Sequence, residues 1–186
     1  MLSDRQILEC ELLVVQCQQG DTSAFESIVR MWERSLFYYL RRLAPSEEDA
    51  WDLLQETWLK TFRSIGSLRD PRSLPAFLYT TARNAAVSRL RNGKLGRELT
   101  CPLDEEMLEM PCEDASDFDD TEHVHHALDR LPLQHREILT LYFLEDLSHE
   151  EIARLLGIPL GTVKSRLHYA KAAIQKLLQE GNHYDQ

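Results

Sequence analysis

A polar and basic segment near the end of the sequence has the clearest binding chemistry. Its candidate contact residues are Thr162, Lys164, Ser165, Arg166, His168, Tyr169 and Lys171. If Val163, Leu167 and Ala170 face inward on a helix, the candidate residues face away from the core or flank it. Short polar and basic side chains at the start of a helix can reach base edges and phosphates in the DNA major groove. The segment therefore favours DNA binding, and the alternative is the solvent-exposed face of an ordinary helical hairpin.

A second group of residues combines positive charge with aromatic rings. The stretch 83–97 contains no acid, and its bases are Arg83, Arg89, Arg91, Lys94 and Arg97. Phe77 and Tyr79 precede them, with Arg69 and Arg72 in the segment just before. Such a mixture suits unpaired nucleic acid, because basic side chains bind the phosphates along the strand and aromatic rings stack on the nucleobases. The alternative is an exposed amphipathic helix with Phe77 in the core.

A third group is acidic. Asp49, Asp52 and Glu56 are three or four residues apart, with Gln55 beside them, so on a helix they form one stripe. We call these four residues the acidic ridge. Spacing alone does not distinguish a functional surface from a face that only contacts water.

Cysteine and histidine could supply metal or redox chemistry. Cys10 and Cys17 would share a helix face, whereas Cys101 and Cys112 precede the histidines His123, His125 and His126. Zinc sites usually contain close pairs such as C-x₂₋₄-C, so we expect no metal; a reversible disulfide between the two later cysteines is an alternative to free thiols. No nucleophile, glycine-rich phosphate loop or carboxylate pair accompanies the histidines, so we expect no catalytic residue, no cofactor and no enzyme.

Apolar residues at three- and four-residue steps predict the helices that position these groups. In the first half the runs cover 7–15, 25–43, 53–62 and 77–90, and the third includes Leu59 and Phe62. Asp21 and Ser46 are expected N-caps, and Pro45 ends the second helix. The segment 66–75, GSLRDPRSLP, is expected to be a loop.

The second half repeats this helical pattern. Short helices are expected at 124–131, ended by Pro132, and at 138–144. Ser148 and Glu151 form an expected capping box, and the turn GIPLG at 157–161 leads into a long helix, which together predict a helix-turn-helix. No segment shows strand alternation, so the fold class is all-α.

The net charge of −10 is concentrated in one segment. Residues 1–100 sum to +1, residues 101–122 to −10 and residues 123–186 to −1. The middle segment has ten acids, two prolines and no base, which is typical of a flexible linker. We therefore expect two small helical domains, 1–100 and 123–186, joined by an acidic linker, and a basic face on either domain stays possible.

Composition excludes several classes of protein. With 186 residues, 43% hydrophobic and 28% charged, the chain can bury a core. Its longest apolar runs fall far short of the roughly 20 residues that span a bilayer. The N-terminus MLSDRQILEC lacks the features of a secretory signal, so we expect a cytoplasmic protein.

The sequence resembles the extracytoplasmic-function (ECF) sigma factors of the sigma-70 family, which are initiation subunits of bacterial RNA polymerase. The matching strings are DLLQETWLKTF at 52–62, LYTTARNAAVSRLR at 78–91 and LPLQHREILTLYFLEDLSHEEIARLLGIPLGTVKSRLHYAK at 131–171. Their order, with an acidic linker between the second and third, makes the resemblance specific. It implies binding to core polymerase and recognition and opening of −35 and −10 promoter DNA without nucleotide hydrolysis. A free-standing helix-turn-helix regulator is the alternative.

The resemblance also implies roles for individual residues. Binding to the polymerase β′ clamp helices is implied for Asp49, Asp52, Gln55 and Glu56. Binding and opening of the −10 element, where a base is flipped out, is implied for Ser67, Leu68, Arg69, Asp70, Arg83, Asn84, Ser88 and Arg91. Recognition of the −35 element is implied for Thr162, Lys164, Ser165, Arg166, His168 and Lys171.

Domains and partners follow from the same resemblance. Residues 1–100 correspond to sigma region 2 and residues 123–186 to sigma region 4, which also contacts the polymerase β flap, while the linker 101–122 threads the polymerase cleft. An anti-sigma factor is an expected partner that could hold the two domains together and mask their DNA faces. The sequence departs from the family at Ser88, where Asp is commoner, at Phe77, near a position that is often Trp, and at His168 and Tyr169, which replace a more basic pair. These departures bear on which promoter is read.

Overall fold

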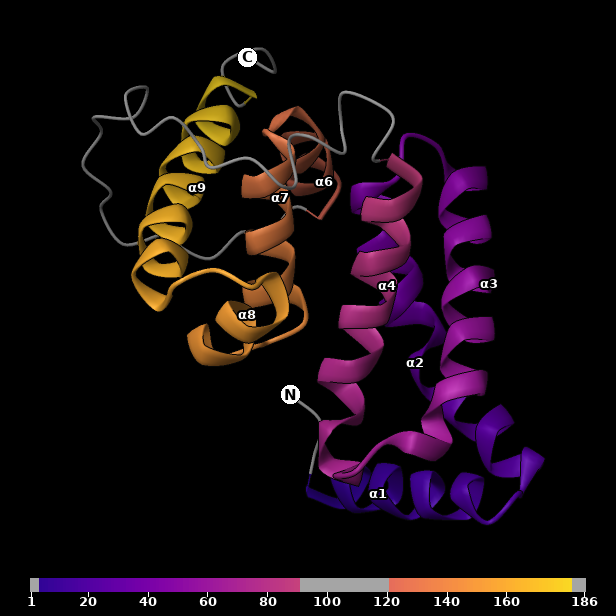
Figure 1. Ribbon diagram of the computed structural model, residues 1–186. Coiled ribbons are helices and arrows are strands. Elements are labelled where there is room, and N and C mark those ends of the chain that lie inside the picture. The colour runs from indigo at the N-terminus through magenta and orange to yellow at the C-terminus, as the bar shows by residue number, and fades with distance from the viewer. Residues whose placement is uncertain (1–3, 91–120, 182–186) are drawn as a thin grey trace. The chain divides into compact units, whose positions relative to one another are not determined.

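The computed structural model describes residues 4–90 and 121–181, and every regular element in these two ranges is a helix (Figure 1). The chain divides into two compact units, Met1–Asn92 and Gly93–Gln186. The all-α prediction is therefore confirmed. No helix in the described ranges is long and apolar enough to cross a membrane.

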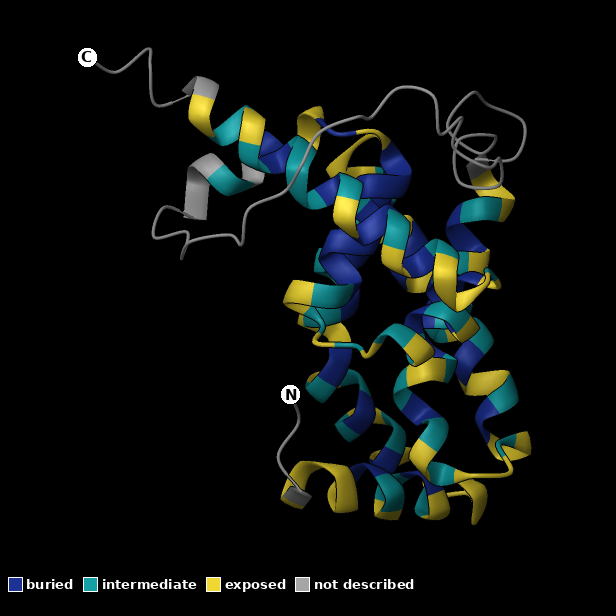
Figure 2. Cartoon of the chain, turned by 90° about the vertical axis from the view of Figure 1, so that its left-hand side faces the viewer, coloured by how far each residue is buried: buried dark blue, intermediate teal, exposed yellow. Residues whose placement is uncertain are grey.

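Three helices form the body of the first unit. They are α2 (Thr22–Leu43), α3 (Glu47–Ser64) and α4 (Leu74–Leu90), and each packs against the other two. The helix α1 (Asp4–Gln18) lies across one end of this bundle and contacts α2 and two short 3₁₀ turns, η1 (Ile65–Ser67) and η2 (Pro71–Ser73) (Figure 1). Buried and exposed residues alternate along the helices (Figure 2). The core includes Ile28, Leu36, Tyr39, Leu53, Leu54 and Leu78.

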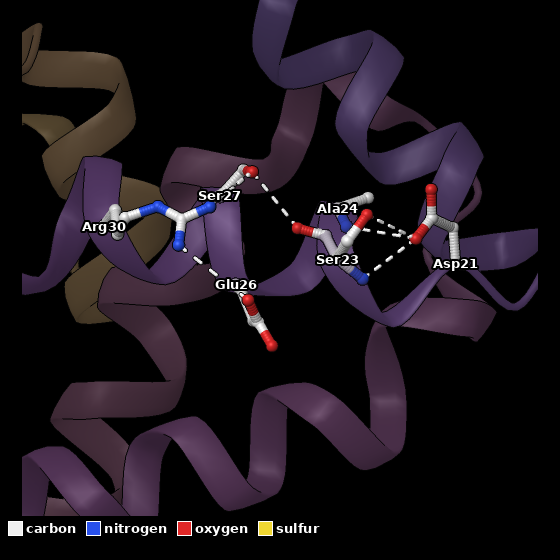
Figure 3. A network of polar contacts seen from close by, with 6 residues as sticks. All are labelled: Asp21, Ser23, Ala24, Glu26, Ser27 and Arg30. Carbon is white, nitrogen blue, oxygen red and sulfur yellow. Dashed lines mark hydrogen bonds and ion pairs between the residues drawn. The ribbon is translucent and has the colours of Figure 1, made fainter.

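The helix starts of this unit follow the capping residues in the sequence. Asp21 caps α2, because its carboxylate accepts hydrogen bonds from the backbone N–H of Ser23 at 2.8 Å and of Ala24 at 3.4 Å (Figure 3). The hydroxyl of Ser23 also donates to this carboxylate, at 2.7 Å, and this bond, followed by those from the backbone, stabilises the charged form and lowers the pKa of Asp21. Ser46 caps α3 by accepting from the N–H of Asp49 at 3.1 Å. Both predicted N-caps are confirmed, as is the end of α2 at Ala44 before Pro45.

The second unit is built around its last helix. α9 (Leu160–Gly181) packs against α6 (Thr121–Arg130), α7 (Leu133–Leu139) and α8 (His149–Leu156). The capping box of Ser148 and Glu151 is present at the start of α8. Gly157 ends α8 in the left-handed conformation, with φ of 69°, which glycine adopts without the clash of a Cβ. The turn to α9 therefore forms as the helix-turn-helix prediction requires.

Several boundaries differ from the predictions. The helix expected at 138–144 begins earlier, as α7, and continues as a π-helix, η4 (Thr140–Leu144), because the N–H of Glu145 bonds the carbonyl of Thr140 at 3.1 Å, five residues back. The loop expected at 66–75 contains most of η1, all of η2 and the first residues of α4. The expected linker lies outside the described residues, except that α6 already begins at its last two positions.

Candidate nucleic-acid interface

The acidic ridge lies on one side of α3. Asp52 and Gln55 are exposed, and Asp49 and Glu56 are half-buried. Two cations of the same unit pair with it. Arg89 of α4 places Nη2 2.8 Å from Asp52 Oδ2 and 3.4 Å from Asp49 Oδ1, and Lys60 Nζ lies 2.6 Å from Glu56 Oε1.

Arg89 therefore joins the ridge to α4. Its hydrogen bond to Asp52 is the main reason that the pKa of its guanidinium is raised, and the charges of Asp52, Asp49 and Glu56 act in the same direction. Solvent-exposed ion pairs add little to stability. The consequence is electrostatic, since part of the negative charge that the ridge presents to a partner is already compensated. Arg89 was expected to contribute to the basic stretch 83–97, but its side chain lies against the acids of α3.

Exposed apolar side chains accompany the ridge on α3. Trp51 is 43% exposed and stacks on Phe37 of α2, with ring centroids 4.1 Å apart. Leu59 and Phe62 are 59% and 55% exposed. Leu59 and Phe62 belong to the predicted apolar run of this helix, whereas the exposure of Trp51 was not predicted. Apolar side chains beside polar ones are typical of surfaces that bind another protein.

The segment between α3 and α4 presents Ser67, Arg69 and Asp70 to solvent and leaves Leu68 half-buried. Two of these side chains form hydrogen bonds with backbone groups two or three residues away. Ser67 Oγ donates to the carbonyl of Ser64 at 2.7 Å, and the Asp70 carboxylate accepts from the N–H of Arg72 at 3.0 Å and caps η2. Arg69 is an exposed cation of this segment.

On α4 the expected contact residues divide into two sets. Asn84 and Ser88 are exposed and four residues apart, so they share a face, and Arg83 is half-buried beside them. Arg91, Lys94 and Arg97 lie outside the described residues. Of the aromatic residues, Phe77 is half-buried, but Tyr79 is only 1% exposed.

The suggestion that Tyr79 stacks on bases is wrong. Its ring packs edge-to-face against Trp32, with centroids 6.2 Å apart, and against Tyr39, at 5.4 Å. This aromatic cluster joins α2 to α4 and belongs to the core of the first unit. The spacing 78, 79, 82, 86 places Tyr79 on the inward face of α4 with Leu78, Ala82 and Ala86.

The start of α9 exposes most of the residues expected there. Lys164 and His168 are exposed, and Thr162, Ser165, Tyr169 and Lys171 are partly exposed. Lys171 Nζ lies over the rings of Tyr142 and Phe143, 5.2 and 5.1 Å from their centroids. This cation–π contact holds the ammonium group beside η4.

Arg166 was expected on the flank of the outer face of α9, but it is only 8% exposed. Helical geometry explains the difference, since residue 166 lies three after Val163 and four before Ala170, on the face that these two bury. Within the unit, its positive charge adds to the effect of burial in lowering the pKa of His135. Arg166 is therefore an interior residue of the second unit.

Cysteines and histidines do not gather in the described part of the chain. No group of three or more potential metal ligands occurs there. Cys10 is buried with its Sγ 3.2 Å from Met31 Sδ, and burial is the main cause of the raised pKa of both Cys10 and Cys17. The other two cysteines and the side chains of His123 and His125 lie outside the described residues.

Comparisons with known proteins match both units. Residues 28–95 match the family model "Sigma-70 region 2", which covers most of α2, all of α3 and α4, and residues 121–174 match "Sigma-70, region 4", which covers α6 to most of α9. The RNA polymerase sigma-H factor of Pseudomonas aeruginosa is 33% identical, over 90% of this chain and 92% of that protein. The ECF RNA polymerase sigma-E factor of Haemophilus influenzae is 31% identical, over 91% of this chain and 95% of that protein.

Solved structures show the same fold. The sigma factor RpoE of Bartonella quintana, solved in complex with the anti-sigma factor NepR, is 27% identical with a TM-score of 0.64, over 83% of this chain and 96% of that one. CnrH, solved in complex with the cytosolic domain of CnrY, aligns with a TM-score of 0.61 at 22% identity, over 92% and 98% of the two chains. The latter likeness concerns the fold alone.

Proposed function

The chain belongs to the ECF group of the sigma-70 family, and from this premise we propose how its two units divide the work of a sigma factor. It is an RNA polymerase sigma factor, which directs promoter-specific initiation by binding core polymerase and recognising and opening promoter DNA. We assign clamp binding and the −10 element to residues 1–100, and the −35 element and the polymerase flap to residues 123–186. The acidic linker, 101–122, is assigned to the polymerase cleft.

The acidic ridge is the proposed docking surface for the β′ clamp helices. This assignment is carried by the ridge residues Asp52 and Gln55, which are exposed beside the exposed Trp51 and Leu59 on the same helix. A surface with carboxylates and apolar side chains together fits a partner helix that presents both basic and apolar residues. Arg89 and Lys60 then have to share the carboxylates with that partner.

The −10 element is assigned to the segment 67–70 and to the exposed face of α4. Arg69, Asn84 and Ser88 are accessible there, and Arg83 adds charge. A surface that binds unpaired bases more tightly than duplex shifts the equilibrium between closed and open DNA toward the open form, by the difference between the two affinities. Opening therefore needs no nucleotide hydrolysis. We therefore propose a sigma factor that is not an enzyme.

The −35 element is assigned to the start of α9. Thr162, Lys164, Ser165 and His168 are accessible there, directly after the turn at Gly157. In a helix-turn-helix, the N-terminal part of the recognition helix is the part that enters the major groove. We assign Arg166, because of its burial, to the support of this helix, and Lys171 to a contact at its edge.

Location and regulation follow as further parts of the proposal. We propose that the protein is cytoplasmic, because the cytoplasm is the compartment of the polymerase. A structural relative at 27% identity was solved with an anti-sigma factor, which supports a similar inhibitor for this chain. A free-standing DNA-binding regulator would need only the second unit and leaves the exposed ridge without a role.

Run-off transcription with core polymerase on a pool of genomic promoters tests the proposal. We expect discrete start sites that disappear in the double variant Asp52→Arg, Glu56→Arg, because two ridge carboxylates become cations. The control is Glu9→Arg, Glu33→Arg, which makes the same change of charge at exposed positions on α1 and α2. Thermal unfolding of each variant shows whether it is folded. A wild-type chain that does not bind core polymerase contradicts the proposal and favours the free-standing regulator.

A further inference from the structure

The helix α1 lies outside the region that matches the family model, which begins at residue 28. Even so, it contacts η1 and η2, the two turns that frame the segment 67–70. This packing places a helix from the beginning of the chain directly against the segment to which we assign the −10 element.

A hydrogen bond connects the end of α1 to this segment. Gln18 Nε2 donates to the backbone carbonyl of Leu68 at 2.8 Å, across fifty residues of sequence. The N–H of Leu68 donates to the carbonyl of Ile65 at 3.1 Å and closes η1. Both backbone polar groups of Leu68 are therefore engaged, which fixes the peptide planes on either side of this residue.

An ion pair connects α1 to the other side of the segment. Arg72 Nε lies 3.2 Å from Glu11 Oε1, and the N–H of Arg72 is also held by the Asp70 carboxylate at 3.0 Å. Ser73 Oγ donates to the carbonyl of Asp70 at 2.6 Å. The segment is thus attached to α1 at Leu68, and the turn η2 that follows it is attached at Arg72, so the exposed Arg69 lies between the two attachments.

We infer that Gln18, assisted by Glu11, is a positioning residue for −10 recognition: it holds the backbone of residues 67–70 in the shape that selects a base. This inference rests on the proposed function, which assigns that segment to the −10 element. Fixing a loop before binding lowers the entropy that binding costs, and it also rejects bases that need a different loop shape. Gln18 itself is not proposed to touch DNA.

The test compares Gln18→Ala with Gln19→Ala in the full chain with core polymerase. Gln19 is the exposed neighbour in sequence and serves as the matched control. The template is a promoter recovered by run-off transcription, together with versions that carry single-base changes in the −10 element. One hydrogen bond shifts an equilibrium roughly fivefold, so we expect Gln18→Ala to reduce discrimination between the original and altered −10 elements about fivefold.

Other readouts separate positioning from general stability. Core binding and the unfolding midpoint of Gln18→Ala should match those of Gln19→Ala. Gln18→Lys, which restores a donor of similar reach, should recover the discrimination. Glu11→Gln should reduce the discrimination less, because an ion pair with the exposed Arg72 is weak. The double variant Glu11→Arg, Arg72→Glu, which exchanges the two charges, should restore the wild-type discrimination.

The possible results are distinct. Equal discrimination by Gln18→Ala and Gln19→Ala overturns the inference, and so does a loss of core binding or stability that accounts for the whole effect. If the wild-type chain yields no start sites with core polymerase, the proposed function itself fails. The inference is supported only by a selective loss of base discrimination in a folded variant that still binds polymerase.

Discussion

Burial controls the charge of His135 in α7. The side chain is 2% exposed, and burial, followed by the nearby charge of Arg166, lowers its pKa. The unfolded chain therefore binds a proton on this residue at a higher pH than the folded protein does. The stabilisation due to the neutral imidazole is complete above the unfolded pKa of about 6.5 and is lost as the pH falls through the lower folded pKa.

We therefore expect the free energy of unfolding of wild type to fall more steeply between pH 7 and pH 5 than that of His135→Gln, which cannot titrate. Urea unfolding at several pH values measures both slopes. His126→Gln, which removes an exposed histidine of α6, is the matched control. If His135→Gln keeps the wild-type slope, the residue does not control the acid response.

Predictions for single residues succeeded where the residue lies clearly within a polar stripe. Asp52, Gln55, Lys164 and His168 are exposed as expected. Tyr79 was placed wrongly, and Arg166, which was expected on the flank of the outer face, is buried, because at both positions the side-chain type and the helical period point to different faces. Burial at such positions is decided by the neighbouring helices, as with Tyr79 against Trp32 and Tyr39.

The turn between α8 and α9 depends on one glycine. Gly157 has φ of 69°, which is unfavourable for a residue with a Cβ, whereas Gly161 lies inside α9, where a Cβ would meet nothing within 4 Å. We expect Gly157→Ala to destabilise the protein by about 1 kcal/mol. Gly161→Ala should stabilise it by roughly 0.5 kcal/mol, because alanine restricts the unfolded chain. Chemical unfolding measures both, and equal effects contradict this account of the turn.

At the scale of elements, local signals were sufficient for most helix starts. Asp21, Ser46 and Ser148 cap the helices they were expected to cap, since capping involves residues only two or three positions apart. The π-helix η4 was not predicted, because the apolar period of 138–144 is the same for an α-helix. The bond from Gln18 to Leu68 was also beyond prediction, since it joins residues fifty positions apart.

For the whole molecule, the distribution of charge matters more than its sum. Ten of the chain's acids lie between residues 101 and 122, and the remainder of the sequence is close to neutral. If this segment competes with DNA for basic surfaces, removing its charge should tighten the binding of duplex DNA by the free chain, with a steeper salt dependence. We propose to replace five linker acids by their amides, at Asp104, Glu105, Glu106, Glu109 and Glu113.

The control replaces five exposed acids of the first unit in the same way, at Glu9, Glu26, Glu33, Glu47 and Glu48. The two variants have equal net charge, so fluorescence anisotropy of labelled duplex at several salt concentrations separates a local effect from a global one. Equal tightening in both variants would show that only the total charge matters. The segment's composition could be predicted from the sequence, but its effect on binding depends on where it lies relative to the basic surfaces.

The ion pairs of Arg89 bear on how this chain can be engineered. Anyone who reprograms promoter choice by randomising α4 also changes the charge balance of α3, because Arg89 contacts Asp52 and Asp49. A library that varies residue 89 together with Asn84 and Ser88 would change the charge of the proposed clamp-binding surface and the face assigned to DNA at the same time. Holding Arg89 constant keeps the charge of the α3 surface unchanged while the DNA-facing residues of α4 vary. An orthogonal pair of sigma factor and promoter can then be selected on base choice alone.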